Sequence, residues 1–321
     1  MKISLILPVY NVEQYVAQCL VSCINQDIPK TDYEIIVVND GTKDNSLAIV
    51  EEIAKTNNNI IVVSQKNAGL SAARNKGLSF AKGDYIWFID TDDKIKENCL
   101  GSVLKKLYSE ELDALGISAV RVIDGKPIEK IYSYRKPDTN TGKEFLRQKL
   151  WLCGAQFTIY KRQFLLDNNL SFMKGVYHED NEFTPRAYFF AEKVGVLCDI
   201  LYFFTHNPNS ITSLVNPKKS YDCVDVAKSL STFNTKYVDD DLTVSFHNQI
   251  ALLINNALYN ILRSDDKDVQ AAFNAYLYQN RNLFTSLVQS SILKYKLEGV
   301  LFKLFPRKSL LVYKLLQKRN S

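Results

Sequence analysis

Residues 1–95 alternate short apolar runs with longer segments in which apolar side chains recur at helical spacing. A short apolar run bounded by polar residues is typical of a strand buried on both faces. Amphipathic helices between such runs predict a parallel sheet covered by helices. The strands are expected at residues 3–7, 33–38, 60–64 and 85–89. The helices that follow the first three strands are expected at residues 12–26, 46–55 and 70–81.

A polar cluster follows the C-terminal end of each predicted strand. In open α/β sheets, ligands bind in the crevice beyond this edge, so we expect side chains from four separate loops to line one crevice. These side chains are Asn11, Asp40, Asp44, Asn67, Arg74, Asp90 and Asp92. None of the loops contains the G-x-G-x-x-G dinucleotide fingerprint or the G-x-x-x-x-G-K-S/T phosphate loop. We therefore expect the crevice to bind a ligand that is recognised by neither of these two loops.

The fourth apolar run, 85–89, leads directly into the three carboxylates Asp90, Asp92 and Asp93. Carboxylates crowded at the end of a buried strand repel one another, and they need a cation or hydrogen-bond donors. An Asp-x-Asp pair offers hard oxygen ligands to Mg²⁺ or Mn²⁺, which would bridge the protein to a substrate diphosphate. Taken alone, the same residues also fit a solvated acidic turn that caps the next helix.

Four segments in this order resemble the family 2 glycosyltransferases, which have the GT-A fold and use nucleotide-sugar donors. The segments are 8–11 (PVYN), 38–46 (VNDGTKDNS), 67–75 (NAGLSAARN) and 88–93 (FIDTDD). The resemblance covers about residues 1–215. It implies an α/β fold of the GT-A type, which is a Rossmann-like mixed, mainly parallel sheet flanked by helices, here with a helical C-terminal extension.

The resemblance implies donor-binding roles in all four loops. Pro8, Tyr10 and Asp40 correspond to the nucleotide-base pocket, where Asp40 would accept a hydrogen bond from a uracil-type N–H. Arg74 corresponds to a further contact with the nucleotide. The full set of expected donor-binding residues is Pro8, Tyr10, Asn11, Asp40, Asn67, Arg74, Asp90, Thr91 and His206.

The same resemblance implies a divalent metal, Mn²⁺ or Mg²⁺. Asp92 would be the main metal-binding carboxylate, and Asp90, which would face the ribose side, is expected as a second metal ligand. The segment 201–212 resembles a family segment that often has Arg after its aromatic residues, and here His206 stands in that region. If the family arginine neutralises the diphosphate, either His206 does so weakly or another cation substitutes. The alternative is a structural histidine.

The middle of the chain is expected to supply the acceptor half of the site. Residues 151–162 resemble the segment that leads into the acceptor region, and residues 177–183 resemble the Glu-Asp motif of the family. In such enzymes the Asp is the general base, which implies this role for Asp180 and a supporting role for Glu179. The alternative is that both acidic residues only favour the positive end of a helix dipole.

The expected domains are a glycosyltransferase domain at 1–218, a helical extension at 219–289 and a basic amphipathic tail at 290–321. The first is divided into a nucleotide-sugar half, 1–95, and an acceptor half, 96–218. Helices are expected around 244–262 and 269–287.

The tail concentrates positive charge, because it has six Lys and two Arg against one Glu and so carries +7, whereas the rest of the chain carries −2. Apolar residues recur in it at helical spacing on both sides of Pro306. Two interpretations stay open. One is an amphipathic segment on an anionic membrane, to which each basic residue contributes roughly 1 kcal/mol. The other is a helical lid packed on the domain with its lysines in solvent.

Composition excludes several classes. With 46% hydrophobic and 23% charged residues the chain is an ordinary globular sequence. The six cysteines are scattered, so we do not expect a zinc site, and we expect the protein to occupy a reducing compartment. No run approaches the roughly 20 apolar residues of a membrane span. A signal peptide is not expected, and neither is nucleic-acid binding. These features predict a cytoplasmic protein, at the inner face of the cytoplasmic membrane if the tail binds lipid.

Together these observations predict an inverting hexosyl- or N-acetylhexosaminyltransferase of the bacterial polysaccharide type. It would move one sugar from a nucleotide sugar, with UDP the expected nucleotide, to a hydroxyl of a glycan or polyprenyl-linked saccharide acceptor. The Gln-x-x-Arg-Trp motif of processive synthases is absent, which favours single additions. The alternative is a catalytically silent nucleotide-sugar-binding subunit of a polysaccharide assembly. A sugar-nucleotide pyrophosphorylase is disfavoured, because its Gly-rich triphosphate loop is missing.

Overall fold

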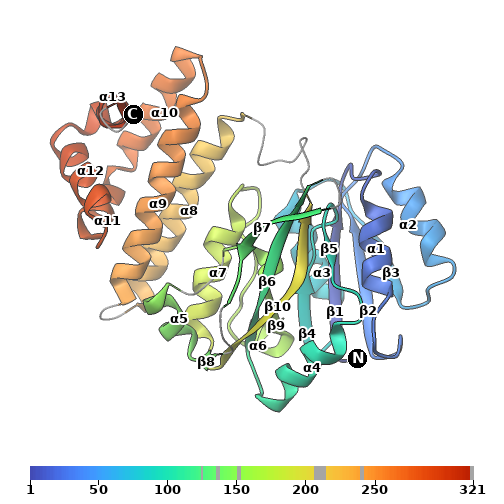
Figure 1. Ribbon diagram of the computed structural model, residues 1–321. Helices are drawn as coiled ribbons and strands as arrows, with labels where there is room; N and C mark the ends of the chain where they lie inside the picture. The colour runs from blue at the N-terminus through green and yellow to red at the C-terminus, as the bar shows by residue number, and fades with distance from the viewer. Residues whose placement is uncertain (124–125, 135–137, 150–152, 206–214, 239–241, 319–321) are drawn as a thin grey trace. The chain divides into compact units, whose positions relative to one another are not determined.

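The structure is a computed structural model that describes residues 1–123, 126–134, 138–149, 153–205, 215–238 and 242–318 (Figure 1). The chain forms two compact units. Unit 1 comprises residues 1–175 and 183–208, and unit 2 comprises residues 176–182 and 209–321. The domain limits expected from the sequence stay predictions.

Within the described residues, unit 1 contains one mixed sheet of ten strands. The order is β3-β2-β1-β4-β9-β6-β10-β5, with β7 paired to β6 and β8 paired to β10. The strands are β1 (Ile3–Val9), β2 (Tyr33–Asn39), β3 (Ile60–Ser64), β4 (Tyr85–Phe88), β5 (Lys94–Ile95), β6 (Ala114–Ile123), β7 (Lys126–Tyr132), β8 (Thr139–Asn140), β9 (Thr158–Lys161) and β10 (Val194–Thr205).

The strands β1 to β4 are mutually parallel, so the loops that follow them lie at one edge of the sheet. β9 is antiparallel to both β4 and β6, which makes β6 and its parallel neighbour β10 run in the same direction as β4. The end of β10 therefore reaches the same edge as the end of β4. This sheet direction positions the candidate site.

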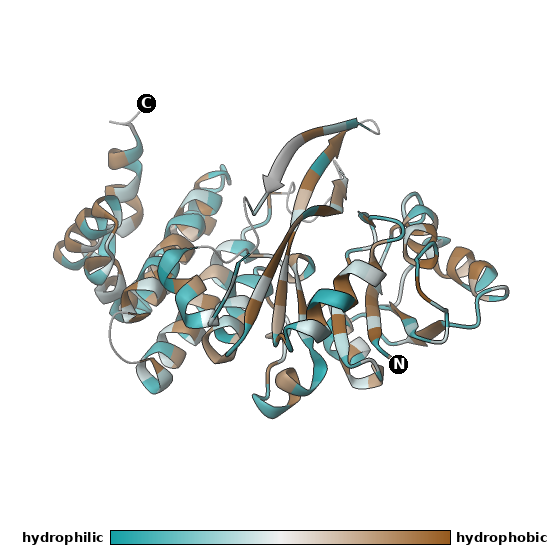
Figure 2. Ribbon diagram, turned by 60° about the horizontal axis from the view of Figure 1, so that its bottom comes forward, coloured by the Kyte–Doolittle hydropathy of each residue, from teal (hydrophilic) through white to brown (hydrophobic). Residues whose placement is uncertain are grey.

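Helices cover both faces of the sheet, as alternation along β1 shows. Ile3, Leu5 and Leu7 pack in one core with apolar residues of α1 and α4. Ile6 points to the other face, toward Gly77 of α3. The helices with residues in unit 1 are α1 (Val16–Ile24), α2 (Ser46–Ala54), α3 (Leu70–Phe80), α4 (Leu100–Ser109), α5 (Gly142–Gln148), α6 (Arg162–Asp167) and α7 (Glu179–Phe190). The central strands are predominantly apolar, as expected for strands buried on both faces (Figure 2).

The described part of unit 2 is mainly helical and includes the first turn of α7. Its other helices are α8 (Lys218–Tyr237), α9 (Leu242–Leu262), α10 (Lys267–Gln279), α11 (Phe284–Gln289), α12 (Leu293–Leu304) and α13 (Ser309–Lys318). The single helix expected over 269–287 is wrong, because α10 ends at Gln279 and a 3-10 turn separates it from α11. Asn280 explains the break, since its side-chain amide donates to the carbonyl of Tyr276 and so competes with helical hydrogen bonding.

Candidate active site

The loops after β1 and β2 are joined by hydrogen bonds around Asn11. The backbone N–H of Asn11 donates to Thr42 Oγ1 at 2.7 Å, and its side-chain oxygen accepts from the N–H of Lys43 at 3.0 Å. Asn11 has a positive φ of 54°, a conformation that asparagine tolerates better than most residues. In the same layer, Asp44 accepts from the N–H of Glu13 at 2.9 Å. These bonds hold the first two loops together at the sheet edge.

Asp40 holds the loop after β3. Its buried carboxylate accepts from Gln65 Nε2, Ala68 N and Gly69 N, each at 2.8 Å. A carboxylate offers about four lone-pair positions, so these three bonds leave one position unused. The structure thus gives Asp40 an organising role beside the base-binding role implied by the resemblance. Asn67, in the loop that Asp40 orders, is exposed.

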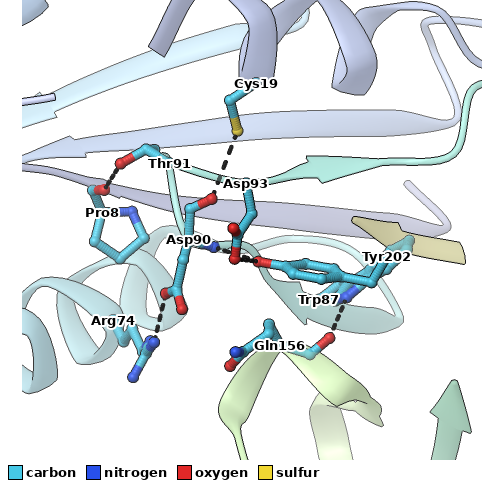
Figure 3. Close-up of polar contacts among 9 residues, drawn as sticks. All are labelled: Pro8, Cys19, Arg74, Trp87, Asp90, Thr91, Asp93, Gln156 and Tyr202. Carbon is cyan, nitrogen blue, oxygen red and sulfur yellow. Dashed lines mark hydrogen bonds and ion pairs between the residues drawn. The ribbon is translucent and has the colours of Figure 1, made fainter. Parts of the chain in front are cut away.

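Arg74 and Asp90 form an ion pair between the helix after β3 and the loop after β4 (Figure 3). Arg74 Nη2 lies 2.6 Å from Asp90 Oδ1, and the guanidinium also lies over the ring of Phe172. The Arg74 side chain is only 2% exposed, whereas that of Asp90 is 24% exposed. A charge-assisted bond of this kind is stronger than a neutral one. Two predicted donor-binding residues are therefore in direct contact.

Thr91 and Pro8 connect the same acidic loop to the end of β1. Thr91 Oγ1 donates to the backbone carbonyl of Pro8 at 2.7 Å, and both residues are buried (Figure 3). Tyr10, two residues after Pro8, is 41% exposed. Of these three predicted residues, Tyr10 is therefore the most accessible to a ligand, whereas Thr91 and Pro8 fix the loop.

Asp93 and Tyr202 form a buried support beneath the acidic loop, a role that was predicted for neither residue. The Tyr202 hydroxyl donates to Asp93 Oδ2 at 2.8 Å and accepts from the N–H of Asp90 at 3.2 Å (Figure 3). Asp93 Oδ1 accepts from the N–H of Thr205 at 2.8 Å. Burial raises the pKa of Asp93 well above its ordinary value, and the negative charges of Asp92 and Asp90 raise it further.

The adjacent carboxylates at 92 and 93 are the sequence signal for this support. Successive side chains of an extended chain point to opposite sides, so one of the two carboxylates must face the interior and needs hydrogen-bond donors there. Asp93 anchors the acidic loop to the end of β10. The segment that follows β10 contains His206, which lies outside the described residues.

The half-buried Asp92 fits a metal that is shared with a substrate. The part of the chain that the structure describes has no group of three or more His, Cys, Asp or Glu side chains arranged to hold a metal ion. Asp90 already pairs with Arg74. Mg²⁺ is commonly bound by one or two carboxylates together with substrate phosphates rather than by a complete protein cage. The donor set present suits that second arrangement.

Glu179 and Asp180 belong to unit 2, in the first turn of α7. Glu179 is buried and Asp180 is half-buried. Asp180 Oδ1 accepts from the backbone and side-chain N–H groups of Asn181 at 2.8 and 2.9 Å. Before them, His178 has a φ of 65°, and burial lowers its pKa although Asp180 opposes this effect. The position suits both the general-base and the helix-dipole interpretations.

Two further contacts support this acidic segment, and both come from α8. Glu182 is buried and accepts from Ser229 Oγ at 2.8 Å, and the N–H of Tyr177 donates to Asp222 Oδ2 at 2.8 Å. These contacts fix both ends of residues 177–182. These contacts could not be predicted from the sequence, because the partners lie on α8, more than 40 residues away.

Comparison with known sequences identifies related glycosyltransferases. The uncharacterized glycosyltransferase EpsJ of Bacillus subtilis is 33% identical over 219 residues, which are 66% of this chain and 63% of EpsJ. The poly(ribitol-phosphate) beta-N-acetylglucosaminyltransferase TarS of Staphylococcus aureus is 28% identical over 69% of this chain and 39% of TarS. The chain thus spans less than two thirds of the length of these curated relatives.

Comparison with solved structures shows the fold. The structure of S. aureus TarS 1–349 in complex with UDP-GlcNAc matches with a TM-score of 0.80 and 22% identity, over 100% of this chain and 93% of that one. The mannosyltransferase PcManGT from Pyrobaculum calidifontis, in complex with GDP-Man and Mn²⁺, matches with a TM-score of 0.57 and 15% identity, over 98% and 86% of the two chains. The expected GT-A fold with a helical C-terminal region is confirmed.

The sequence model described as Glycosyl transferase family 2 matches residues 4–167, which include the loops after β1 to β4 and the Arg74–Asp90 pair. This match covers just over half of the chain, and it coincides with the part of the sheet that brings the predicted donor-binding loops to one edge. The chain belongs to glycosyl transferase family 2.

Proposed function

We propose that this protein is an inverting glycosyltransferase that moves one sugar from a UDP-sugar to a hydroxyl of a glycan or polyprenyl-linked saccharide acceptor. The observation that carries the proposal is the shared edge of the sheet in unit 1, where Arg74 balances Asp90 and Asp92 stays partly accessible. Family membership and the fold shared with a UDP-GlcNAc-bound relative support it.

The donor site comprises the loops after β1 to β4. Tyr10 offers an exposed ring for the nucleotide base, and Asp40 keeps one lone-pair position for a uracil-type N–H. Asn67 lies exposed in the loop that Asp40 orders. The other donor-binding residues are Pro8, Asn11, Arg74, Asp90 and Thr91, together with His206 from the segment after β10.

Asp92 would hold Mn²⁺ or Mg²⁺ together with the donor diphosphate, and Asp90 would add negative charge beside it. The ion would supply charge neutralisation of the diphosphate, which makes it a better leaving group. Arg74 keeps Asp90 in place, and Asp93 keeps the loop fixed through Tyr202. A preorganised loop avoids the cost of reorganisation when the donor binds.

Asp180 would act as the general base and Glu179 would orient it. As the acceptor oxygen attacks the anomeric carbon of the donor, its proton passes to the Asp180 carboxylate. The bond from the anomeric carbon to the diphosphate oxygen breaks, and the nucleoside diphosphate leaves with that electron pair. Such a base contributes roughly 10²–10⁴-fold. One in-line displacement inverts the anomeric centre and requires no covalent nucleophile.

The proposal also covers the acceptor class and the place of the reaction in the cell. Two relatives are named as poly(ribitol-phosphate) glycosyltransferases, which supports a polymeric acceptor. No helix among the described residues is long and apolar enough to cross a membrane. We place the reaction in the cytoplasm and assign a peripheral membrane contact to residues 292–319.

The release of nucleoside diphosphate from a sugar nucleotide, with and without Mn²⁺, tests the activity. The donor is first chosen by thermal shift against a panel of sugar nucleotides, because a ligand that binds the folded state raises its stability. The wild type should release diphosphate slowly in an Mn²⁺-dependent manner, and Asp92→Ala should lose this dependence. Asp84→Ala, at the other end of β4, serves as the matched control. No release from any donor would favour the silent binding subunit instead.

A further inference from the structure

The helix α12 packs against unit 2 through one well-defined face. Phe302 is fully buried and its ring lies 5.4 Å from that of Phe284 on α11. A Cβ on Gly299 would come within 2.7 Å of Leu287 Cβ, so a glycine is needed where α12 crosses α11. Glu298 is buried as well and accepts from Asn255 Nδ2 on α9 at 2.7 Å. This is the inner face of α12.

The opposite face of α12 is apolar and exposed. Leu293, Leu297, Val300 and Leu304 are 68%, 55%, 44% and 65% exposed. At about 100° per residue, these four side chains fall within a sector of about 60° centred opposite Phe302. We call them the outer stripe. The side of a helix that points away from its protein is normally polar, and a leucine stripe there leaves apolar surface without a partner in the described chain.

Positive charge flanks the outer stripe on both sides. Lys296 and Lys303 lie on one side of it, and Lys294 lies on the other, where it pairs with Glu298 at 3.9 Å; all three lysines are exposed. The single acidic residue of the tail, Glu298, is buried on the inner face. The next helix, α13, repeats this pattern. Its side chains Leu310 and Tyr313 are buried, whereas Leu311, Lys314 and Leu315 are exposed.

A cationic hollow lies at the turn between α12 and α13. It has a volume of about 240 Å³ and is lined by Tyr278, Phe305, Pro306, Arg307 and Lys308. The guanidinium of Arg307 lies 5.3 Å from the centre of the Tyr278 ring, and that of Arg281 lies 4.8 Å from it. Aromatic rings with adjacent guanidinium groups suit a phosphate with an attached apolar chain.

We propose that the outer stripe of α12 lies in the interface of an anionic lipid bilayer, with the flanking lysines and the Arg307 hollow at the level of the headgroup phosphates. Leucines in the middle and basic residues on both flanks are the pattern of an interfacial helix. A second copy of the chain fits less well, because two surfaces with the same positive charge would face each other. The inference deepens the membrane contact of the proposed function by naming the surface that makes it.

Vesicle flotation of the full-length protein, without sugar nucleotide, tests the inference. Phosphatidylcholine vesicles with and without phosphatidylglycerol are compared. The wild type should float with the anionic vesicles only. Leu297→Gln/Leu304→Gln should weaken binding by more than tenfold, whereas Leu166→Gln, an exposed leucine on α6, should leave it unchanged. Lys296→Gln/Lys303→Gln should weaken binding about fivefold for each lysine removed.

Point variants are preferable to truncation before Ser290, because removal of α12 would uncover the core around Phe284. Circular dichroism verifies that each variant is folded. Wild-type flotation of Leu297→Gln/Leu304→Gln overturns the inference, and so does equal binding to neutral vesicles. A dimer that this double variant dissociates, without vesicle binding by the wild type, identifies a second copy as the occupant instead. Diphosphate release measured on the same samples reports the proposed activity separately.

Discussion

At the scale of single residues, the polar side chains at the sheet edge divide into those that hold loops and those that stay accessible. Asn11 and Asp40 each form hydrogen bonds with a neighbouring loop, and Thr91 forms one with Pro8 at the end of β1. Tyr10 and Asp92 are more accessible than the buried Asp40 and Thr91, and Asn11 is exposed although it bonds the neighbouring loop. A ligand that enters this edge therefore meets a surface whose charges and amides are already fixed.

Arg74→Ala should lower the free energy of unfolding by about 2–3 kcal/mol. It removes the cation beside Asp90 and opens a cavity, and the partial exposure of Asp90 reduces the cost below that of a fully buried pair. Urea unfolding measures the change. Lys76→Ala on the same helix is the control and should stay within about 0.5 kcal/mol. An equally small change for Arg74→Ala would show that the pair does not stabilise the fold.

Asp180→Asn should retain donor binding and lose sugar transfer by roughly 10²–10⁴-fold, because the amide cannot accept the acceptor proton. Donor affinity by calorimetry and transfer rate in the same buffer separate the two effects. Asp167→Asn, on the exposed end of α6, is the matched control. Transfer at the wild-type rate in Asp180→Asn would remove this residue from the role of base.

At the scale of elements, the sequence predicted the local part of the sheet and missed the non-local part. The strand expected at 60–64 agrees with β3, and those at 3–7 and 33–38 differ from β1 and β2 by one or two residues at the end. Their apolar runs and polar ends are short-range signals. No strand was expected after residue 95, because the pairing of β9 between β4 and β6 depends on residues distant in the sequence.

The candidate site follows the same division. Asn11, Asp40, Asp44, Asn67, Asp90 and Asp92 lie in the loops after β1 to β4, because strand direction alone fixes that placement, whereas Arg74 lies on α3. The support of Asp93 by Tyr202 was missed, because its partners are 109 residues apart and β10 had not been identified. Asp40 was expected to contact a ligand. Its bonds to the loop after β3 were not predicted, because they depend on how closely the loops after β2 and β3 approach each other.

The N-terminus of α2 depends on the charge of Asp44, which is half-buried. Burial raises the pKa of this carboxylate, but hydrogen bonds from the Ser46 and Thr42 hydroxyls and from the N–H groups of Glu13 and Ser46 outweigh it and lower the pKa to about 2. Because the folded-state pKa lies below the unfolded value, the stabilisation is present above about pH 4 and is lost as the pH falls toward 2.

Asp44→Asn should therefore cost about 1–2 kcal/mol at neutral pH, after allowance for solvent screening. The difference from the wild type should shrink as the pH is lowered from 4 to 2, which urea unfolding across this pH range measures. Glu52→Gln, an exposed position on the same helix, should show neither effect. A difference that stays constant down to pH 2 would assign the loss to packing rather than to charge.

At the scale of the whole molecule, each of the two compact units buries large apolar side chains of its own. Those of unit 1 lie on its sheet and on helices such as α1 and α4, and those of unit 2 include Phe273, Phe284 and Phe302 on its helices. The two tryptophans of the sequence, at positions 87 and 151, both fall within residues 1–175 of unit 1. Tryptophan fluorescence therefore reports on unit 1, whereas far-ultraviolet circular dichroism also detects the helices of unit 2.

Phe302→Ala should destabilise unit 2 by about 3–5 kcal/mol, because the ring is fully buried against Phe284. Part of the helical dichroism should then be lost at lower urea, while the fluorescence transition stays at its wild-type midpoint. Leu304→Ala, two residues on and exposed, should move neither probe. If both probes shift together in Phe302→Ala, the units unfold as one cooperative body, and the tail stabilises the donor-binding loops as well as its own helices.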